Sequence, residues 1–301
     1  METIKKALRG GLPCNEKGLL DSYHENIFQG LMPKVFCKMF LNGSGNELYT
    51  KAKAVHSSAM LAYNFFHWVL KKNRYIVIDG IKYTNVFFEV KMNVLQGTTP
   101  ANMDILLVGE KRNKVHLMFI ESKFLEYLES KEYELGKTYR NALKWYKSTE
   151  IEDWIPLLDE VESLVDSEKE CRYKEGIKQG VSHLFALTNL SNETAFNYFI
   201  EQNNLQEAIR INSIREAEIH FINLFFEPAK HFKDDHTKFD EYKKLYEEYI
   251  KIVNDHSSIE FKIKTYSDLW KSKEIENQIK KVNNGHLHQY LNNRYMRFAE
   301  I

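Results

Sequence analysis

The sequence predicts an α/β protein, and three observations support this fold class. Runs rich in β-branched and aromatic residues predict strands at 75–95, 101–109 and 115–124. Helical periodicity precedes and follows these runs, and a further strand-like run, 217–228, ends at Pro228. Only five prolines and thirteen glycines occur in 301 residues, which favours long helices. Nothing resembles a flexible linker, so we expect a single domain over residues 1–301.

The composition is that of an ordinary globular protein, with 43% hydrophobic and 28% charged residues. Lys and Arg number 42, as do Asp and Glu, so the net charge neither indicates nor excludes a nucleic-acid partner. The three cysteines, Cys14, Cys37 and Cys171, are too widely spaced for a disulfide framework or a zinc site. The first residues lack the apolar core of a secretory signal, and no apolar run is long enough to cross a membrane. We expect a cytoplasmic protein without membrane contact.

The first half of the chain predicts helices and then hairpins. Residues 17–41 are expected to be helical, up to the breaker "NGSGN". A helix is predicted from Glu47 to Lys72 because apolar residues recur there at three- and four-residue spacing. Asp79-Gly80 indicates a hairpin turn within 75–95. The polar turn "EKRNK" joins 101–109 to 115–124 in an antiparallel hairpin.

The second half is predicted to be mostly helical. Helical periodicity runs from Leu125 to about Leu205, and its acidic stretch "EIEDWIPLLDEVESLVDSEKE" is interpreted as a solvated helix face. The tail, 236–301, is expected to be helical apart from "IEFKIKTY", which could form an edge strand. Residues 229–301 are therefore predicted to be a mostly helical C-terminal elaboration.

The hairpin between 101 and 124 carries a group of charged residues. If its turn is centred on Arg112 and Asn113, residues whose numbers sum to 225 lie opposite each other, as Asp104 and Glu121 do. Directly opposed residues share a face with Cβ atoms about 4.5–5.5 Å apart. Lys123 points to the same face because strand side chains alternate. Two adjacent carboxylates repel each other unless positive charge neutralises them, and Mg²⁺ prefers oxygen ligands of this kind.

These residues resemble a known nuclease signature. "PANMD" followed after sixteen residues by "ESK" is similar to the bipartite motif of the PD-(D/E)XK nucleases, the restriction-endonuclease-like superfamily. The resemblance implies an αβββαβ core with a mixed sheet over 47–228, with long helical insertions and the helical C-terminal extension. The sequence departs from the pattern at Pro100, which lies four residues before Asp104 instead of next to it.

The resemblance implies a Mg²⁺-dependent nuclease, with Mn²⁺ as a substitute, that hydrolyses phosphodiester bonds of DNA. Asp104 and Glu121 would hold the metal together with the backbone carbonyl of Ser122. Lys123 would act on the attacking water or the transition state, so Asp104, Glu121 and Lys123 are the predicted catalytic residues. A homodimer is left open, because enzymes that cut both strands need two sites. No residue distinguishes DNA from RNA.

Several further residues could complete the site. Glu89 could supply another carboxylate to the metal, or it could be an exposed strand residue paired with Lys91. Gln179 and His183 lie one helical turn apart and could contact substrate, or they could form a polar helix stripe. The remaining candidates, each with an ordinary structural alternative, are Glu126, His56, Ser57 and Asn64.

Three alternatives to a nuclease stay open at this point. Asp104, Glu121 and Lys123 could form a charge ladder on the surface of a hairpin. A catalytically silent relative could keep the nuclease fold and bind nucleic acid or a protein partner without cutting. A helical interaction scaffold could be built on the acidic segment 148–170.

Overall fold

A computed structural model describes all of the chain except residues 1–2, 44–47, 94–99, 133–138, 140–153 and 208–213. Its centre is a six-stranded mixed sheet with the strands in chain order. The strands are β1 Ile76–Ile78, β2 Ile81–Met92, β3 Ala101–Lys111, β4 Lys114–Lys123, β5 Glu218–Phe225 and β6 Glu260–Thr265. Strands β1 to β4 pair antiparallel, whereas β4–β5 and β5–β6 pair parallel. The predicted α/β class is confirmed.

Helices cover both faces of this sheet. The α-helices are α1 Ile4–Arg9, α2 Lys34–Asn42, α3 Ser58–Phe66, α5 Trp154–Ser167, α6 Glu175–Thr188, α7 Glu193–Gln202, α9 Lys233–His256, α10 Tyr266–Lys271, α11 Lys273–Lys280 and α12 His286–Arg294. Short 3-10 helices are η1 Tyr23–Asn26, η2 Phe28–Gly30, η3 Lys51–Lys53, η4 His67–Leu70, η5 Glu126–Leu128, η7 Asn189–Ser191, η8 Leu205–Glu207, η9 Val282–Gly285 and η10 Met296–Phe298. In the described part of the chain, no helix is long and apolar enough to span a membrane.

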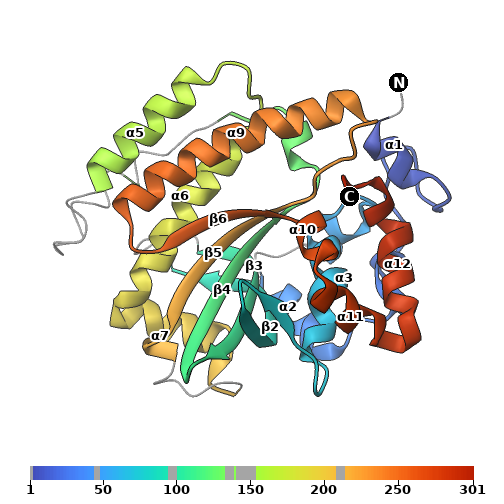
Figure 1. Ribbon diagram of the computed structural model, residues 1–301, viewed down its shortest axis with the longest axis horizontal. Coiled ribbons are helices and arrows are strands. Elements are labelled where there is room, and N and C mark those ends of the chain that lie inside the picture. The colour runs from blue at the N-terminus through green and yellow to red at the C-terminus, as the bar shows by residue number, and fades with distance from the viewer. Residues whose placement is uncertain (1–2, 44–47, 94–99, 133–138, 140–153, 208–213) are drawn as a thin grey trace.

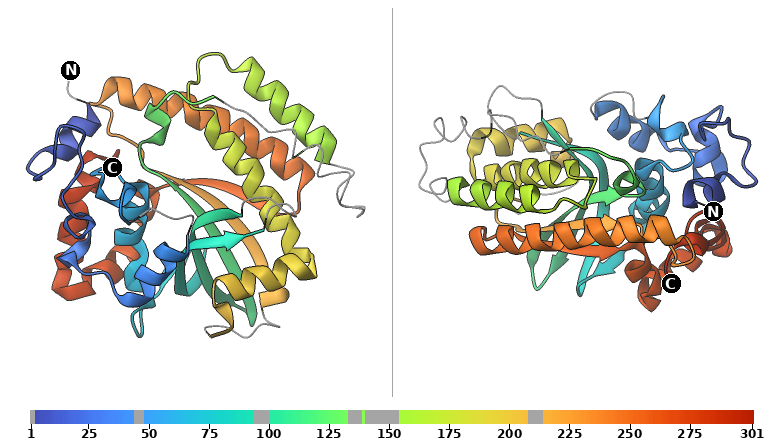
Figure 2. Two further views of the ribbon diagram at one scale, coloured as in Figure 1. Left: turned by 180° about the vertical axis from the view of Figure 1, so that it is seen from behind. Right: turned by 90° about the horizontal axis from the view of Figure 1, so that it is seen from above.

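The two faces of the sheet are covered by different helices. On one face, α6, α7 and α9 pack through aromatic contacts such as Phe119 with Phe199 and Phe225 with Tyr242, and α5 lies along the outer side of α9 (Figure 1). The other face contacts α2, α3 and α10, for instance where Phe88 meets rings of α2 and α3. Helices α1 and α12 lie together at one side of the molecule, near both termini (Figure 2).

The β3–β4 hairpin has the predicted register. Its pairs run from Lys111 with Lys114 to Ile105 with Ile120, and the numbers of each pair sum to 225. Arg112 and Asn113 both have positive φ, 53° and 62°. Two positive φ angles in a two-residue loop are those of a type I′ turn, whose twist matches that of the strands. The turn therefore sets which side chains share a face.

The predicted helix over 17–41 is wrong from residue 17 to Pro33. Gly18 and Gly30 have positive φ, 74° and 67°, which an α-helix cannot contain, and short 3-10 turns occupy this stretch. An α-helix, α2, begins only after Pro33. Apolar residues in this stretch are buried by tertiary packing instead of by a helix stripe.

The helix predicted from Glu47 to Lys72 is much shorter. Glu47 lies outside the described residues, and α3 begins at Ser58 because the Ser57 hydroxyl caps the helix by accepting from the N–H of Met60. The preceding backbone bonds elsewhere, since the N–H of Leu20 donates to the carbonyl of Lys53. Much of the segment 125–205 is helical as expected, in η5, α5, α6 and α7, and 133–138 and 140–153 within it are not described.

The tail agrees with the prediction of helices plus an edge strand, since β6 forms the last strand of the sheet. It is closely joined to the rest of the protein. A buried carboxylate, Asp235 at the start of α9, accepts from the N–H of Ile4, and the side chains of α9 pack on β5. One hydrophobic cluster extends from Ile4 to Ala299.

Candidate active site

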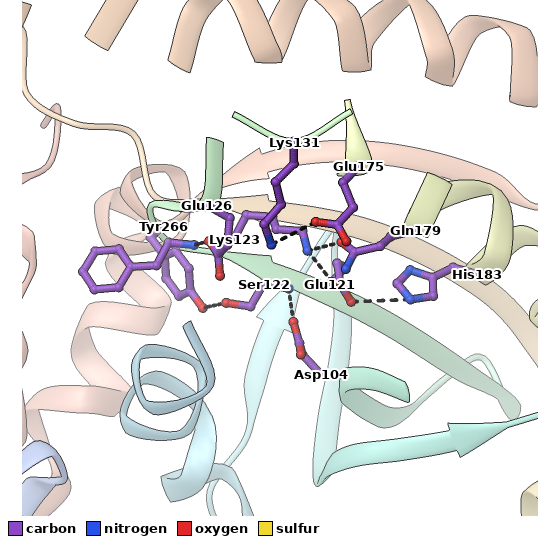
Figure 3. A network of polar contacts seen from close by, with 11 residues as sticks. Asp104, Glu121, Ser122, Lys123, Glu126, Lys131, Glu175, Gln179, His183 and Tyr266 are labelled. Atoms are coloured by element: carbon purple, nitrogen blue, oxygen red, sulfur yellow. Dashed lines mark hydrogen bonds and ion pairs between the residues drawn. The ribbon is translucent and has the colours of Figure 1, made fainter. Parts of the chain in front are cut away.

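A cavity of about 710 Å³ lies at the end of β4 where Glu121, Ser122 and Lys123 stand. Its lining includes seven of the predicted site residues: Glu89, Asp104, Glu121, Ser122, Lys123, Gln179 and His183. Figure 3 shows all of these residues except Glu89 converging from β3, β4 and α6. The predicted residues are thus brought together in space, although they span almost a hundred positions of the chain.

Asp104 is tied to the neighbouring strand by a backbone hydrogen bond. It lies on β3 just beyond the last regular pair with β4, and its Oδ2 accepts from the N–H of Ser122 at 2.7 Å. The bond fixes the carboxylate beside Glu121, on the face of the sheet that the register predicts. The reading of these residues as an exposed charge ladder is wrong, because Glu121 and Lys123 are only 7% and 4% exposed.

Lys123 is a buried cation held between two side chains. Its Nζ lies 2.6 Å from Oε1 of Glu121, and it also donates to Oε1 of Gln179 on α6. Burial acts to lower the pKa of Lys123, but Glu121 and the other acidic groups around it, Tyr173, Glu126 and Asp104, together raise the pKa well above the usual range. Lys123 is therefore protonated at neutral pH and acts as a hydrogen-bond donor at this site.

Asp104, in contrast to Lys123, is buried beside two other carboxylates. Burial raises the pKa of Asp104 well above its usual range, and the carboxylates of Glu121 and Glu89 raise it further. Lys123 and the Ser122 N–H act against this rise in the pKa without cancelling it. A cation placed beside these carboxylates would therefore be bound favourably.

The donor set fits a hard divalent cation such as Mg²⁺. Oε2 of Glu121 is buried and has no hydrogen-bond partner among the described residues; Nε2 of His183 lies 3.7 Å from it. The carboxylate oxygens of Asp104, Glu121 and Glu89 do not all lie within 4.8 Å of one another. Among the described residues, only a different group of side chains brings three ligand atoms that close together. Mg²⁺ accepts such an open set, because it takes one or two carboxylates and fills its other positions with water and phosphate.

Glu89 occupies an unusual backbone position. It has φ of 51° in the middle of β2, and the β2–β3 register passes from Phe88 with Ile105 to Val90 with Met103 without pairing it. The side chain is 6% exposed, so the reading of Glu89 as an exposed strand residue is wrong. Such a left-handed conformation costs about 1 kcal/mol or more and is retained at functional sites. The strained backbone thus keeps a third carboxylate in the cavity.

Helix α6 positions Gln179 and His183, and two glycines allow it to approach α9 closely. A Cβ atom added to Gly176 would lie 2.0 Å from Oη of Tyr242, and one added to Gly180 would lie 2.8 Å from Cε1 of Tyr249. Larger residues at either position would push α6 outward and withdraw Gln179 from Lys123. Burial lowers the pKa of His183, so this imidazole is neutral beside Glu121.

The other candidate residues divide into two groups. His56, Ser57 and Glu126 line the cavity. Glu126 does not contact Lys123 in a hydrogen bond; its Oε2 accepts from the N–H of Phe124 at 2.7 Å and stabilises the turn after β4. Asn64 is not part of the site, because its amide bonds Phe28 and neighbouring groups in the core.

Two features of the site were not predicted. Lys131 forms a 3.0 Å ion pair with Glu175 at the edge of the cavity, and Tyr173 also lines it. Glu175 could have been found by extending the stripe of Gln179 and His183 back by one turn. The hydroxyl of Ser122 bonds that of Tyr266 at 2.7 Å, so the C-terminal part of the chain supports the motif (Figure 3).

Comparison of the chain with protein-family models, curated proteins and solved structures finds no match.

Proposed function

We propose that this protein is a Mg²⁺-dependent nuclease that hydrolyses phosphodiester bonds, with DNA as its substrate and Asp104, Glu121 and Lys123 as its catalytic residues. The observation that carries the proposal is the convergence of these three side chains in one cavity, with Lys123 in contact with Glu121 and Asp104 tied to Ser122. This arrangement combines oxygen ligands for a dication with a fixed cation for phosphate.

The order of elements supports a restriction-endonuclease-like core. Helix α3 precedes the antiparallel strands β2, β3 and β4, and α6 then leads to β5, which pairs parallel with β4. This is the αβββαβ order that the motif implies, with β1 and β6 as additional edge strands. The motif residues stand on the second and third strands of that core.

The roles of the residues follow from their charges. When bound, Mg²⁺ would neutralise the carboxylates and the scissile phosphate and lower the pKa of an attacking water. Asp104 and Glu121 would hold it, together with Glu89 and the Ser122 carbonyl. Lys123, being permanently protonated, stabilises the negative charge that develops on the phosphate, and Gln179 orients its Nζ. Water attacks phosphorus directly, without a covalent intermediate.

The charge of the cavity predicts an order of binding. Its lining has more carboxylates than lysines; the carboxylates are Glu89, Asp104, Glu121, Glu126, Glu129 and Glu175, and the lysines are Lys51, Lys123 and Lys131. A polyanion would be repelled from this cavity until a dication is bound. We therefore expect substrate affinity to depend on Mg²⁺, even in variants that do not cut.

The test is incubation of the purified protein with circular plasmid and Mg²⁺ or Mn²⁺. Asp104→Asn and Glu121→Gln should abolish cleavage, and Lys123→Met should slow it by about 10²–10³. The matched controls, Asp166→Asn and Lys271→Met, change exposed residues on α5 and α10 and should cut normally. Equal cleavage by the three site variants and their controls would refute the proposal.

A second function is favoured by one observation. Lys123 already neutralises Glu121 in the protein without metal, as expected of a relative that keeps the fold but binds nucleic acid or a protein partner without cutting. Calorimetric titration with Mg²⁺ separates the two functions. An enzyme should bind the ion with an affinity that falls in Glu121→Gln, whereas a silent relative should show no binding.

A further inference from the structure

A second group of metal-ligating side chains lies on the opposite face of the sheet. His116 on β4 pairs in register with Glu218 on β5, and His220 is two residues farther along β5. Because strand side chains alternate, these three residues share one face, whereas Glu121, five residues from His116, belongs to the other. The cluster is therefore separate from the cavity that holds Asp104 and Lys123.

The three ligand atoms form a compact triangle. His116 Nδ1 lies 3.0 Å from His220 Nε2 and 3.2 Å from Glu218 Oε2, and the third side, from His220 Nε2 to Glu218 Oε2, is 4.0 Å. In a tetrahedral zinc site with ligand distances of about 2.0–2.1 Å, neighbouring ligand atoms are about 3.3 Å apart. Small side-chain movements would bring all three sides of the triangle to that value.

Neighbouring groups prepare these ligands for a metal. Lys114 holds Oε1 of Glu218 at 2.8 Å, which leaves Oε2 directed to the histidines, and outer contacts of this kind orient metal ligands. His116 is 5% exposed, so its ring is held in place by the fold. An N–H···N hydrogen bond between the two rings would by itself explain why the histidines lie so close together. Oε2 of Glu218, however, lies beside the same Nδ1 of His116 and completes a set of three metal ligands.

We infer that His116, Glu218 and His220 form a binding site for Zn²⁺ or a similar transition-metal ion. Two imidazoles and one carboxylate are ligands that suit Zn²⁺ rather than Mg²⁺, which prefers oxygen donors. The two sites of the protein would thus select different metals. Zinc here links the beginnings of β4 and β5, whose other ends carry and support the proposed active site.

The zinc site has an open fourth position. The group lines a cavity of about 440 Å³ whose remaining charged residues are Asp79, Lys111, Arg112, Lys114 and Lys262. Asp79 is engaged by Lys262 and Lys264, so the cavity presents mainly positive charge. A water or a small anion is the fourth ligand that fits these surroundings.

The inference is tested by metal titration of chelator-treated protein. Zn²⁺ binding is measured by calorimetry, and the coordination of Co²⁺ is followed by its visible spectrum, which is intense for a tetrahedral ion. Wild type should bind one Zn²⁺ here, and His220→Gln and Glu218→Gln should each weaken it by more than the about 10–100-fold expected for an outer contact. Both residues are partly exposed, so the variants should remain folded, as thermal melting will verify.

Two controls locate the ion. His256→Gln removes another histidine that pairs with a glutamate, Glu160, and should bind Zn²⁺ as wild type does. Asp104→Asn should also leave this binding intact, whatever its effect on cleavage. The inference is overturned if wild type binds no Zn²⁺, if His220→Gln and Glu218→Gln bind it unchanged, or if Asp104→Asn is the variant that loses it.

Discussion

The close approach of α6 to α9 yields a prediction that can be worked from the structure. Gly176→Ala places a methyl group 2.0 Å from Oη and 2.8 Å from Cζ of Tyr242, which is fully buried. Alanine gains about 1 kcal/mol of helix propensity over glycine. Overpacking of a buried site costs about 1–3 kcal/mol, and so short a contact belongs at the upper end. We expect a net loss of about 2 kcal/mol in the free energy of unfolding.

Tyr242→Phe provides the matched test of this reasoning. The hydroxyl of Tyr242 is buried without a hydrogen-bond partner among the described residues, so its removal should be neutral or stabilising. In the double variant Gly176→Ala/Tyr242→Phe the shortest contact disappears, and part of the lost stability should return. Such contacts give coupling energies of about 0.5–3 kcal/mol in a double-mutant cycle.

Urea unfolding followed by circular dichroism measures all four proteins of the cycle. Plasmid cleavage by the same proteins links the packing to the site, because an outward shift of α6 would withdraw Gln179 from Lys123. Cleavage should therefore fall in Gly176→Ala and recover in part in the double variant. The reasoning is refuted if Gly176→Ala is as stable as wild type, or if the two substitutions are additive.

Three further predictions concern the charged groups of the cavity. Because the pKa of Asp104 is raised in the folded protein, the metal-free protein should lose stability as pH rises above the ordinary value of 3.8. Asp104→Asn should reduce this loss and melt higher at pH 7, and a lower Tm would contradict the prediction. Mg²⁺ should raise the Tm of wild type but not that of Asp104→Asn. Lys123→Met leaves Glu121 buried and unpaired, so the free energy of unfolding in urea should fall by about 3–5 kcal/mol. The double variant Lys123→Met/Glu121→Gln should regain stability but not cleavage. Burial and the positive charges of Lys5 and Arg9 lower the pKa of His56 from 6.5 to about 4. The free energy of unfolding should therefore fall by at most about 3 kcal/mol as pH drops from 6.5 to 4. His56→Gln should flatten this part of the unfolding profile, and an unchanged slope would contradict the lowered pKa.

The predicted and observed structures agree best where local chemistry determines geometry. Arg112 and Asn113 accept the positive φ that a tight turn requires, and that turn fixes the register over the whole hairpin. Alternation then places Asp104, Glu121 and Lys123 on one face without any knowledge of the remaining chain. The motif could be predicted because its residues lie on two strands joined by two residues.

The chain by itself therefore determined the α/β class, the main hairpin and the charged group on it. Only the tertiary structure decided where α2 and α3 begin, because the segments before them bond to each other, as the N–H of Leu20 does to the carbonyl of Lys53, although their apolar residues suggested longer helices. It also decided that Glu89 is buried in a strained conformation. Periodicity does not reveal such features, since it records which residues are apolar and not which contacts bury them.

Contacts between distant segments could not be predicted from the sequence for the same physical reason. Gly176 is needed on α6 because Tyr242 of α9, far along the chain, lies against it. His116 and Glu218 meet because β4 and β5 pair in parallel, and the register of parallel strands joined by a long connection is set by packing of the whole core. Local turn chemistry thus specified the candidate active site, whereas the packing of remote elements specified its surroundings and the cluster of His116, Glu218 and His220.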